Sequence, residues 1–468
     1  MKTAHWIARC SGGTLAALLA VGPGPVLADE ADKAQIRELA TKIETLQAQL
    51  KALADRQSAA TLAPAPAPAP AAQAAVVTEG DMPGSFKLPG TNTSMKIGGF
   101  AALDIVKDFT GGGMGGAVAQ PQSIAFDGSA QSKRDGQLSM TARRSRLNVR
   151  TSTPTDYGNV TTHIEGDFIG GSGNELVTNS ASFRLRHAYV EAGPWLAGQS
   201  WTNFADLATF PETVDFQGGH GMVQAIRQPQ LRYTKKWGAH EFAAAIENPE
   251  ADIVGMSVAS FNPGVGPVPT THVDELPDLT MRYAFAGDWG RIALGAVARK
   301  LSIDNRGAGA INGFVGDDSV TAGGLMLAGR IKTGGKNSLQ FGVEGGSGIG
   351  RYITGSPIPT AAVMSDGSLK AVKSWGAMLG YQHHWSPTWR SNVTYGQVRL
   401  DNPHPAMAVT AVSRVDALFL NLIWQPIPRA LLGIEYVRGE VENDAPKTAT
   451  LSNKGRADRL GATVQYHF

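Results

Sequence analysis

The sequence has no run of eighteen uninterrupted apolar residues, although it is 468 residues long and 42% hydrophobic. A membrane-spanning helix needs about twenty predominantly apolar residues, so we expect no helical span. A chain can also cross a bilayer as a closed β-barrel, whose short alternating strands contain no long apolar run. The missing run therefore excludes one membrane architecture and leaves the other open.

Cysteine is nearly absent, since Cys10 is the only one. It lies in a segment with the features of an export signal, namely early basic residues, the apolar core Thr14–Val21 and small residues at 26–28 that suit cleavage. Removal of this signal, residues 1–28, leaves an exported chain without disulfides or cysteine chemistry.

The sequence also lacks an excess of basic or of acidic residues. The signal holds two of the 42 Lys and Arg residues, so forty basic residues face 40 acidic ones in the exported chain. A neutral chain gives no support to nucleic-acid binding.

Catalytic motifs are also lacking. The chain has no G-x-S-x-G nucleophile pattern, no G-x-G-x-x-G between a strand and a helix, and no metal-ligand spacing. A hydrolase would also need a base beside its nucleophile, yet the histidines are scattered: His163, His187, His240, His383 and His384. We expect neither an enzyme nor a cofactor nor a metal.

A heptad pattern stands out near the N-terminus. Apolar residues recur at alternating spacings of three and four over residues 32–57, at Ile36, Leu39, Ile43, Leu46, Leu50 and Leu53. This is the seam of a coiled coil. A lone amphipathic helix of this length is marginal in water, so we expect the seam to pair with further copies, in a number that the pattern leaves open.

Proline then separates this helix from the rest of the chain. Residues 63–70 read APAPAPAP, which favours an extended, semi-rigid spacer. The predicted organisation is a signal peptide at 1–28, a coiled-coil helix at 29–60, an Ala/Pro-rich linker at 61–84 and a β-barrel at 85–468.

From Lys96 onward the apolar residues alternate with period two. In the last strand Leu460, Val464 and Tyr466 alternate with small or polar residues such as Thr463 and Gln465. One apolar and one polar face is typical of a membrane barrel strand, although a soluble sandwich has the same periodicity.

The lengths of the connections between these strands favour a membrane barrel over a soluble sandwich. Short connections fall near 154–157, 193–194, 235–238, 287–289, 333–336, 384–387 and 425–428. Long ones cover 108–140, 169–180, 202–224, 248–276, 301–319, 347–370, 401–411 and 439–455. Short turns on one rim and long loops on the other are typical of outer-membrane barrels, and this alternation predicts sixteen antiparallel strands. Six tryptophans near the short turns fit an interfacial belt: Trp195, Trp237, Trp289, Trp385, Trp389 and Trp424.

Sixteen strands enclose a water-filled pore, and strand parity predicts what lines it. Arginine is costly on the lipid face, so the strand arginines are expected inside. The predicted pore-lining and anion-binding residues are Arg144, Arg146, Arg150, Arg184, Arg186, Arg232, Arg282 and Arg299. Arg227 breaks parity with Arg232 unless the strand is bulged at Pro229. Clustered guanidiniums attract anions and can hold carboxylates with two hydrogen bonds.

Acidic residues inside the barrel are expected to be fewer. Glu165, Asp167 and Glu344 share the inward parity. The long segment 198–221 carries Asp206, Glu212 and Asp215, and it is a candidate constriction loop that either caps the pore or folds inward to narrow it.

The order of these features resembles the DcaP-like trimeric porins over nearly the whole exported chain. The resemblance rests on the heptad helix, the Ala-Pro linker, the opening SFKLPGTNTSMKIGGFAALD, the strands RRSRLNVRT and FRLRHAYVE, the segment 198–217 and the terminal Phe468. It implies an outer-membrane trimer, a periplasmic coiled coil and passage of dicarboxylate-type anions. The expected partners are further copies, outer-membrane lipid, small anionic solutes and, on the periplasmic side, peptidoglycan, but no nucleic acid. Two alternatives stay open: a structural barrel that tethers the envelope, and a phosphate-selective porin.

Overall fold

The computed structural model describes residues 30–62, 78–116, 118–171, 178–223, 226–254, 272–304, 306, 315–356, 359–404 and 406–468. The chain divides into two units, Met1–Val76 and Val77–Phe468. The expected export signal and the APAPAPAP segment lie outside the described residues.

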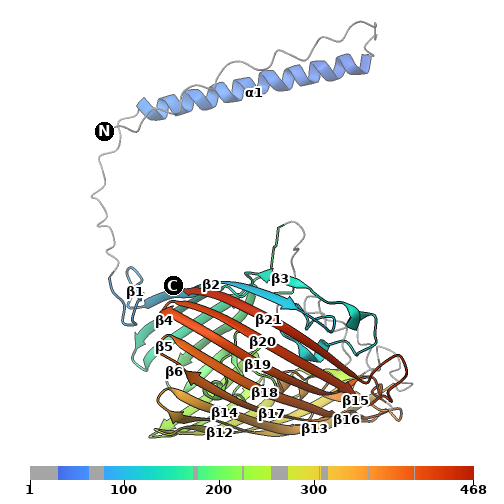
Figure 1. Ribbon diagram of the computed structural model, residues 1–468. Helices are drawn as coiled ribbons and strands as arrows, with labels where there is room; N and C mark the ends of the chain where they lie inside the picture. The colour runs from blue at the N-terminus through green and yellow to red at the C-terminus, as the bar shows by residue number, and fades with distance from the viewer. Residues whose placement is uncertain are drawn as a thin grey trace. The chain divides into compact units, whose positions relative to one another are not determined.

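The first unit contains one helix, α1 (Glu30–Leu62), so the predicted helical segment is confirmed (Figure 1). Its heptad residues Leu39, Ile43, Leu46, Leu50 and Leu53 are 54–67% exposed. Nothing else in the described part of this unit covers the apolar seam. Within the described part of the chain, no helix is both long and apolar enough to cross a membrane.

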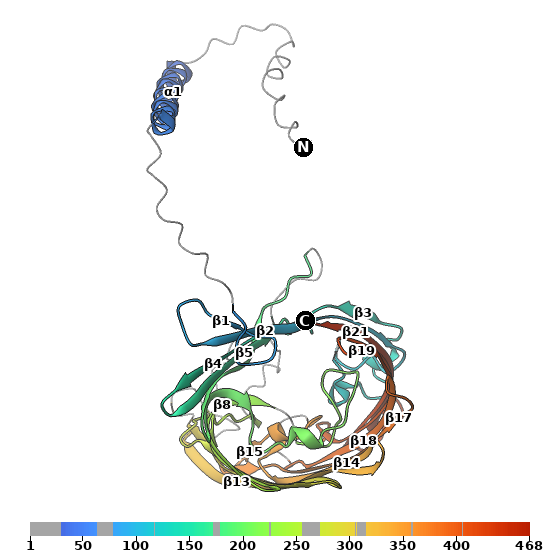
Figure 2. The ribbon, with the colours of Figure 1, turned by 90° about the vertical axis from the view of Figure 1, so that its left-hand side faces the viewer.

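The second unit is a closed barrel of sixteen antiparallel strands, as the alternation of connections predicts (Figures 1 and 2). The first eight barrel strands are β2 (Ser94–Asp108), β3 with β4 (Leu138–Thr141 and Arg146–Thr155), β5 (Gly158–Asp167), β6 (Arg184–Ala192), β7 (Trp195–Trp201), β8 (Arg227–Trp237), β9 (His240–Glu247) and β11 (Asp278–Gly287). The other eight are β12 (Gly290–Asp304), β13 (Asp317–Gly334), β14 (Asn337–Ser347), β17 (Lys373–His384), β18 (Trp389–Asp401), β19 (Val412–Ile427), β20 (Ala430–Asn443) and β21 (Lys454–His467).

Pairing of the first and last barrel strands closes the sheet. β2 pairs with β21 from Phe100 opposite His467 to Asp108 opposite Arg459. On its other edge β2 pairs with β4 through Ser94–Phe100 and with β3 further along. β3 and β4 thus form one barrel strand with a break at residues 142–145, and closure leaves no free sheet edge.

The connections follow the predicted alternation. Each of the seven short turns joins two strands on one rim, from Thr155–Gly158 between β4 and β5 to Ile427–Ala430 between β19 and β20. The eight long connections lie on the other rim. We call the two ends the short-turn rim and the long-loop rim. All six tryptophans of the predicted belt are 38–66% exposed.

The two faces of the wall differ as strand parity predicts. In β21 Leu460, Val464 and Tyr466 are exposed on the outside, whereas Thr463 and Gln465 are buried inside. An apolar outer face suits lipid, because hydrocarbon cannot hydrate polar side chains.

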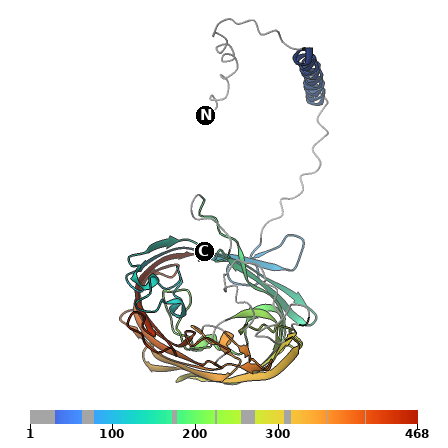
Figure 3. The same ribbon diagram turned by 90° about the vertical axis from the view of Figure 1, so that its right-hand side faces the viewer.

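Long loops fill part of the interior, and chain segments are visible inside the ring in Figures 2 and 3. β10 (Ile253–Val254), β15 (Ala361–Val363) and β16 (Leu369–Ala371) form a separate small sheet, and β1 (Phe86–Lys87) pairs with β2. The loops also hold single 3-10 turns: Pro121–Ser123, Gln131–Lys133, Leu207–Thr209 and Gly350–Tyr352. Buried apolar loop residues such as Phe204, Ile349 and Tyr352 pack against inward-facing alanines and methionines of the wall. The apolar core therefore lies between the loops and the inner wall.

Candidate functional site

The connection between β7 and β8 folds into the barrel. It begins with Thr202 and Asn203, whose hydroxyl and backbone N–H donate to the Glu247 carboxylate at 2.7 and 2.6 Å. Further on, Val214 and Asp215 donate their backbone N–H groups to Glu435 of β20 at 2.9 and 2.8 Å. The loop is thus tied to β9 at its start and to β20 on another part of the wall, and we call residues 202–223 the constriction loop.

Two acidic residues of the constriction loop bind arginines of the wall. Asp206 lies 2.7 Å from Arg291 and 3.7 Å from Arg282. Glu212 accepts two hydrogen bonds of 2.6 Å from Arg390. Charge-assisted hydrogen bonds are strong, and the bidentate bond of Glu212 especially so, so these contacts hold the loop and neutralise the two acidic side chains.

Glycines leave room for the loop against the inner wall. A Cβ on Gly396 of β18 would lie 1.8 Å from the His220 carbonyl oxygen. Gly221 has a φ of +70° and would bring a Cβ within 2.3 Å of the Ala377 oxygen. Any side chain at either position would collide with backbone, so these glycines permit the close approach.

His220 fixes the middle of the loop by packing. Its ring stacks on Phe419 with centroids 5.3 Å apart and an interplanar angle of 14°. Burial lowers the pKa of His220 to about 3, so the ring is neutral at physiological pH. The imidazole therefore acts as a flat apolar contact.

Arginines gather on the wall formed by β4 to β6. Arg186 binds Glu165 at 2.8 Å and Asp167 at 3.0 Å. Arg184 donates twice to Asp167, at 2.8 and 2.9 Å, and Arg146 lies 3.4 Å from Glu165. The predicted side chains of both signs thus meet in one network.

The break between β3 and β4 brings in a fourth arginine. Arg144 lies in this break, where it pairs with Asp104 at 3.2 Å and donates to the Val214 carbonyl oxygen of the constriction loop at 2.6 Å. Interruption of a strand re-aims its side chains, and here it turns Arg144 toward the loop.

Two aromatic rings organise the same arginines. Phe216, near the tip of the constriction loop, has the guanidinium carbons of Arg144, Arg184 and Arg186 at 6.0, 5.5 and 5.4 Å from its centroid. Trp201 has Arg227 at 4.6 Å. Cation–π contacts hold these guanidiniums without consuming their hydrogen-bond donors. We call Arg144, Arg146, Arg184, Arg186 and Arg227 the arginine cluster.

Two cavities flank these features. One of about 1010 Å³ is lined by Arg144, Arg184, Asp215, Phe216 and Arg459, among others. The second, of about 860 Å³, lies at the short-turn rim and is lined by turn residues together with Arg232, Glu241 and Arg282.

The remaining predicted arginines have different environments. Arg150 is exposed and makes no hydrogen bond or ion pair with any described residue, and the Nε of Arg232 has no hydrogen-bond partner in the described part of the chain. Arg282 binds Glu241 at 2.8 Å. Arg299 is instead fully buried against Asp278 at 2.9 Å, so its guanidinium supports the wall.

The remaining predicted acidic residues are held inside as well. Asp215 accepts backbone N–H groups from Ala119 and Gln217, both at 2.8 Å. Glu344 is only 2% exposed, and neither of its oxygens has a hydrogen-bond partner among the described residues.

Sequence reasoning missed the residues that hold the constriction loop. Arg291 shares inward parity with Ala293, and Arg390 shares it with Asn392, so strand parity could have found both. The aromatic partner Phe216 carries no such signal, because it lies outside any periodic segment.

A family model for the DcaP outer membrane protein matches residues 27–461. The chain belongs to the DcaP outer membrane protein family. Among solved structures it is similar to the outer membrane channel DcaP of Acinetobacter baumannii, with 22% identity, a TM-score of 0.66 and coverage of 80% of this chain and 97% of that one. It is also similar to Salmonella typhi OmpF in complex with daunomycin, with 10% identity, a TM-score of 0.50 and coverage of 80% and 98%. A comparison with curated protein sequences finds no match.

The barrel and the family together make this DcaP family member an outer-membrane channel. Porins and channels as a class are not enzymes.

Proposed function

We propose that this channel lets small anionic solutes, in particular dicarboxylates, diffuse through a pore narrowed by the constriction loop. The observation that carries the proposal is the arginine cluster at the loop tip. Four of the five arginines there form ion pairs, with only three carboxylates, Asp104, Glu165 and Asp167, so the guanidiniums outnumber their ion-pair partners.

The surroundings of the cluster favour anions further. Asp206 and Glu212 are paired with wall arginines, so within the described residues Asp215 is the one acidic side chain of the constriction loop without an arginine partner. Within low-dielectric walls an unbalanced positive charge attracts anions more strongly than it would in water. Guanidinium forks also match the planar geometry of carboxylates, which favours dicarboxylates over a solute that carries a single compact charge.

We further propose that three copies assemble, with α1 on the periplasmic side. The exposed seam at Leu39, Ile43, Leu46, Leu50 and Leu53 supports self-association, because an isolated helix of this kind is marginal in water. The first barrel strand, β2, starts at the short-turn rim, and the last one, β21, ends there. In outer-membrane barrels this rim faces the periplasm.

Ion selectivity tests the proposed function. Arg146→Gln combined with Arg186→Gln removes two of the five positive charges of the cluster, so the reversal potential in a salt gradient across a planar bilayer should shift toward cations. Block of the current by succinate should weaken, and in the unmodified protein succinate should block at lower concentration than inorganic phosphate.

A matched variant removes two lysines at the long-loop rim, Lys447 between β20 and β21 and Lys454 at the start of β21. Lys447 is exposed and Lys454 is 3.7 Å from Glu442. Charges further than about 8 Å from the solute path are screened at physiological salt, so Lys447→Gln with Lys454→Gln should move the reversal potential far less. Equal shifts in the two double variants would contradict the proposal, as would an unmodified channel without anion preference.

A further inference from the structure

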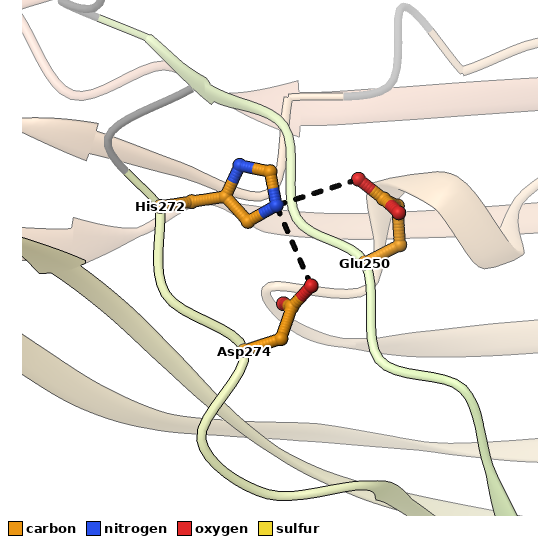
Figure 4. A group of neighbouring side chains, drawn as sticks. All are labelled: Glu250, His272 and Asp274. Atoms are coloured by element: carbon orange, nitrogen blue, oxygen red, sulfur yellow. Dashed lines mark ion pairs between the residues drawn. The ribbon is translucent and has the colours of Figure 1, made fainter. Parts of the chain in front are cut away.

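A second site lies on the long-loop rim, away from the arginine cluster. Glu250 follows β9, and His272 and Asp274 precede β11, so the three side chains come from the two stems of one long loop. Figure 4 shows the imidazole and the two carboxylates pointing toward one another. Their potential ligand atoms lie within 4.8 Å of each other. Twenty-one residues separate Glu250 from His272, which is why sequence spacing does not reveal the group.

The separations do not fit direct hydrogen bonds. His272 Nε2 lies 3.5 Å from a Glu250 oxygen and 3.4 Å from an Asp274 oxygen. Hydrogen bonds from N–H to oxygen span 2.7–3.2 Å. A tetrahedral zinc ion, with bonds of about 2.0–2.2 Å, places its nitrogen and oxygen ligands about 3.4 Å apart. Both nitrogen–oxygen distances therefore match the spacing of two ligands around one cation better than the spacing of a hydrogen-bond donor and its acceptor.

Both stems are held by the barrel. The backbone oxygen of Glu250 accepts hydrogen bonds from Arg299 and, at 3.1 Å, from Arg351. Val273 donates its backbone N–H to the Ser302 oxygen of β12 at 2.9 Å. Such support pre-positions ligands, so ordering them costs little when an ion binds.

Exposure and charge also suit an ion from solution. The His272 side chain is 12% exposed, while those of Glu250 and Asp274 are 56% and 32% exposed. The imidazole is thus largely buried, with its Nδ1 unpaired among the described residues, and the carboxylates face solvent. Glu250 and Asp274 bring two carboxylates to the same place, and Asp252 lies two residues from Glu250. Lys300 is engaged by Glu275 and so does not occupy the site.

We propose that Glu250, His272 and Asp274 bind a divalent first-row transition-metal cation on the long-loop rim, with zinc as the representative. One imidazole nitrogen and two carboxylate oxygens leave a fourth position for water. Magnesium and calcium prefer oxygen ligands alone, so the histidine selects against them. The bound ion bridges the two stems of the loop. This site is independent of the solute that the channel carries.

Zinc titration of the untagged, full-length protein in detergent tests the site, with a chromophoric chelator as competitor. We expect one zinc ion per chain, at least tenfold weaker binding in His272→Ala, and no competition from excess magnesium. His404→Ala is the matched control, because His404 also lies on a long loop but faces one carboxylate, Asp444, at 3.2 Å. Its zinc affinity should equal that of the unmodified protein. No stoichiometric binding, or equal affinity in His272→Ala and the unmodified protein, would overturn the proposal.

Cobalt gives a second readout that depends on coordination geometry. Addition of Co²⁺ should produce the visible absorption of a four-coordinate ion, and Glu250→Gln with Asp274→Asn should abolish it while the heat-dependent gel shift of the folded barrel is retained. These amide variants keep the shape of both side chains, so loss of the signal reports lost ligands. An unchanged cobalt spectrum in this folded double variant would refute the assignment.

Discussion

At the scale of single residues, two buried glutamates on the inner wall have opposite environments. Glu435 accepts hydrogen bonds from Val214, Asp215 and the Asn421 side chain, the last at 2.9 Å. Glu344 has no partner for either oxygen among the described residues. A buried carboxyl group without partners costs free energy, whereas one that accepts three bonds supports the structure.

We therefore expect Glu344→Met, which keeps an unbranched side chain of similar length, to raise the free energy of unfolding by about 1–3 kcal/mol. Glu435→Met should lower it by a similar amount, because two backbone N–H groups of the constriction loop lose their acceptor. Unfolding by urea in detergent, followed by tryptophan fluorescence, measures both. If the Glu344→Met protein were less stable than the Glu435→Met protein, the two glutamates would not have the opposite effects on stability that we expect.

Residue positions could be predicted where a strand dictates them. Parity assigns Arg146, Glu165 and Asp167 to one face, and the structure joins them in one network. Strand parity does not predict which inward-facing side chains remain exposed to solute and which are buried in ion pairs. Arg299 and Arg150 have the same predicted orientation, yet one is buried in an ion pair and the other is exposed. The difference comes from loops that cover parts of the wall.

At the scale of elements, strands and connections follow from local pattern. The period of two and the turn residues act over a few positions, so sixteen strands could be read from the sequence. The path of the constriction loop could not, because its contacts are remote in sequence: Glu212 meets Arg390 and Val214 meets Glu435. Such contacts exist only after the barrel has closed.

The fit of this loop depends on the missing side chain of Gly396. We expect Gly396→Ala to displace the constriction loop, because the new Cβ would lie 1.8 Å from the His220 oxygen. The single-channel conductance should rise, while the closed ladder keeps the barrel folded.

The matched control is Gly342→Ala on β14. A Cβ there would meet nothing nearer than 3.8 Å, at Met222, which is ordinary van der Waals contact. Its conductance should equal that of the unmodified channel. If both alanine variants conduct alike, the loop is not held by close approach at Gly396.

At the scale of the whole molecule, the two units have separate sources of stability. The barrel satisfies its backbone within a closed ladder, and its N-terminal hairpin uses Thr78, whose oxygen accepts from Lys87 at 2.9 Å. The helix α1 has an apolar seam that no other described residue of its own unit covers. The barrel should therefore fold without α1, whereas α1 needs partner copies.

Removal of residues 29–76, with the signal retained, separates these roles. The shortened protein should still show the heat-dependent gel shift of a folded barrel, since Thr78 and every barrel strand remain. Loss of that shift would mean that the barrel depends on the N-terminal unit.

Substitutions in the seam test the association that we propose. Leu46→Gln with Leu50→Gln should lower the temperature at which trimers dissociate in mild detergent, because polar side chains at these positions remove the apolar contact between helices. Ala48→Gln with Ala52→Gln makes the same polar change off the seam and should leave that temperature unchanged. Native mass spectrometry gives the copy number. A monomer or dimer in the unmodified protein would exclude the trimer, and equal dissociation temperatures in the two double variants would show that the seam does not hold the copies together.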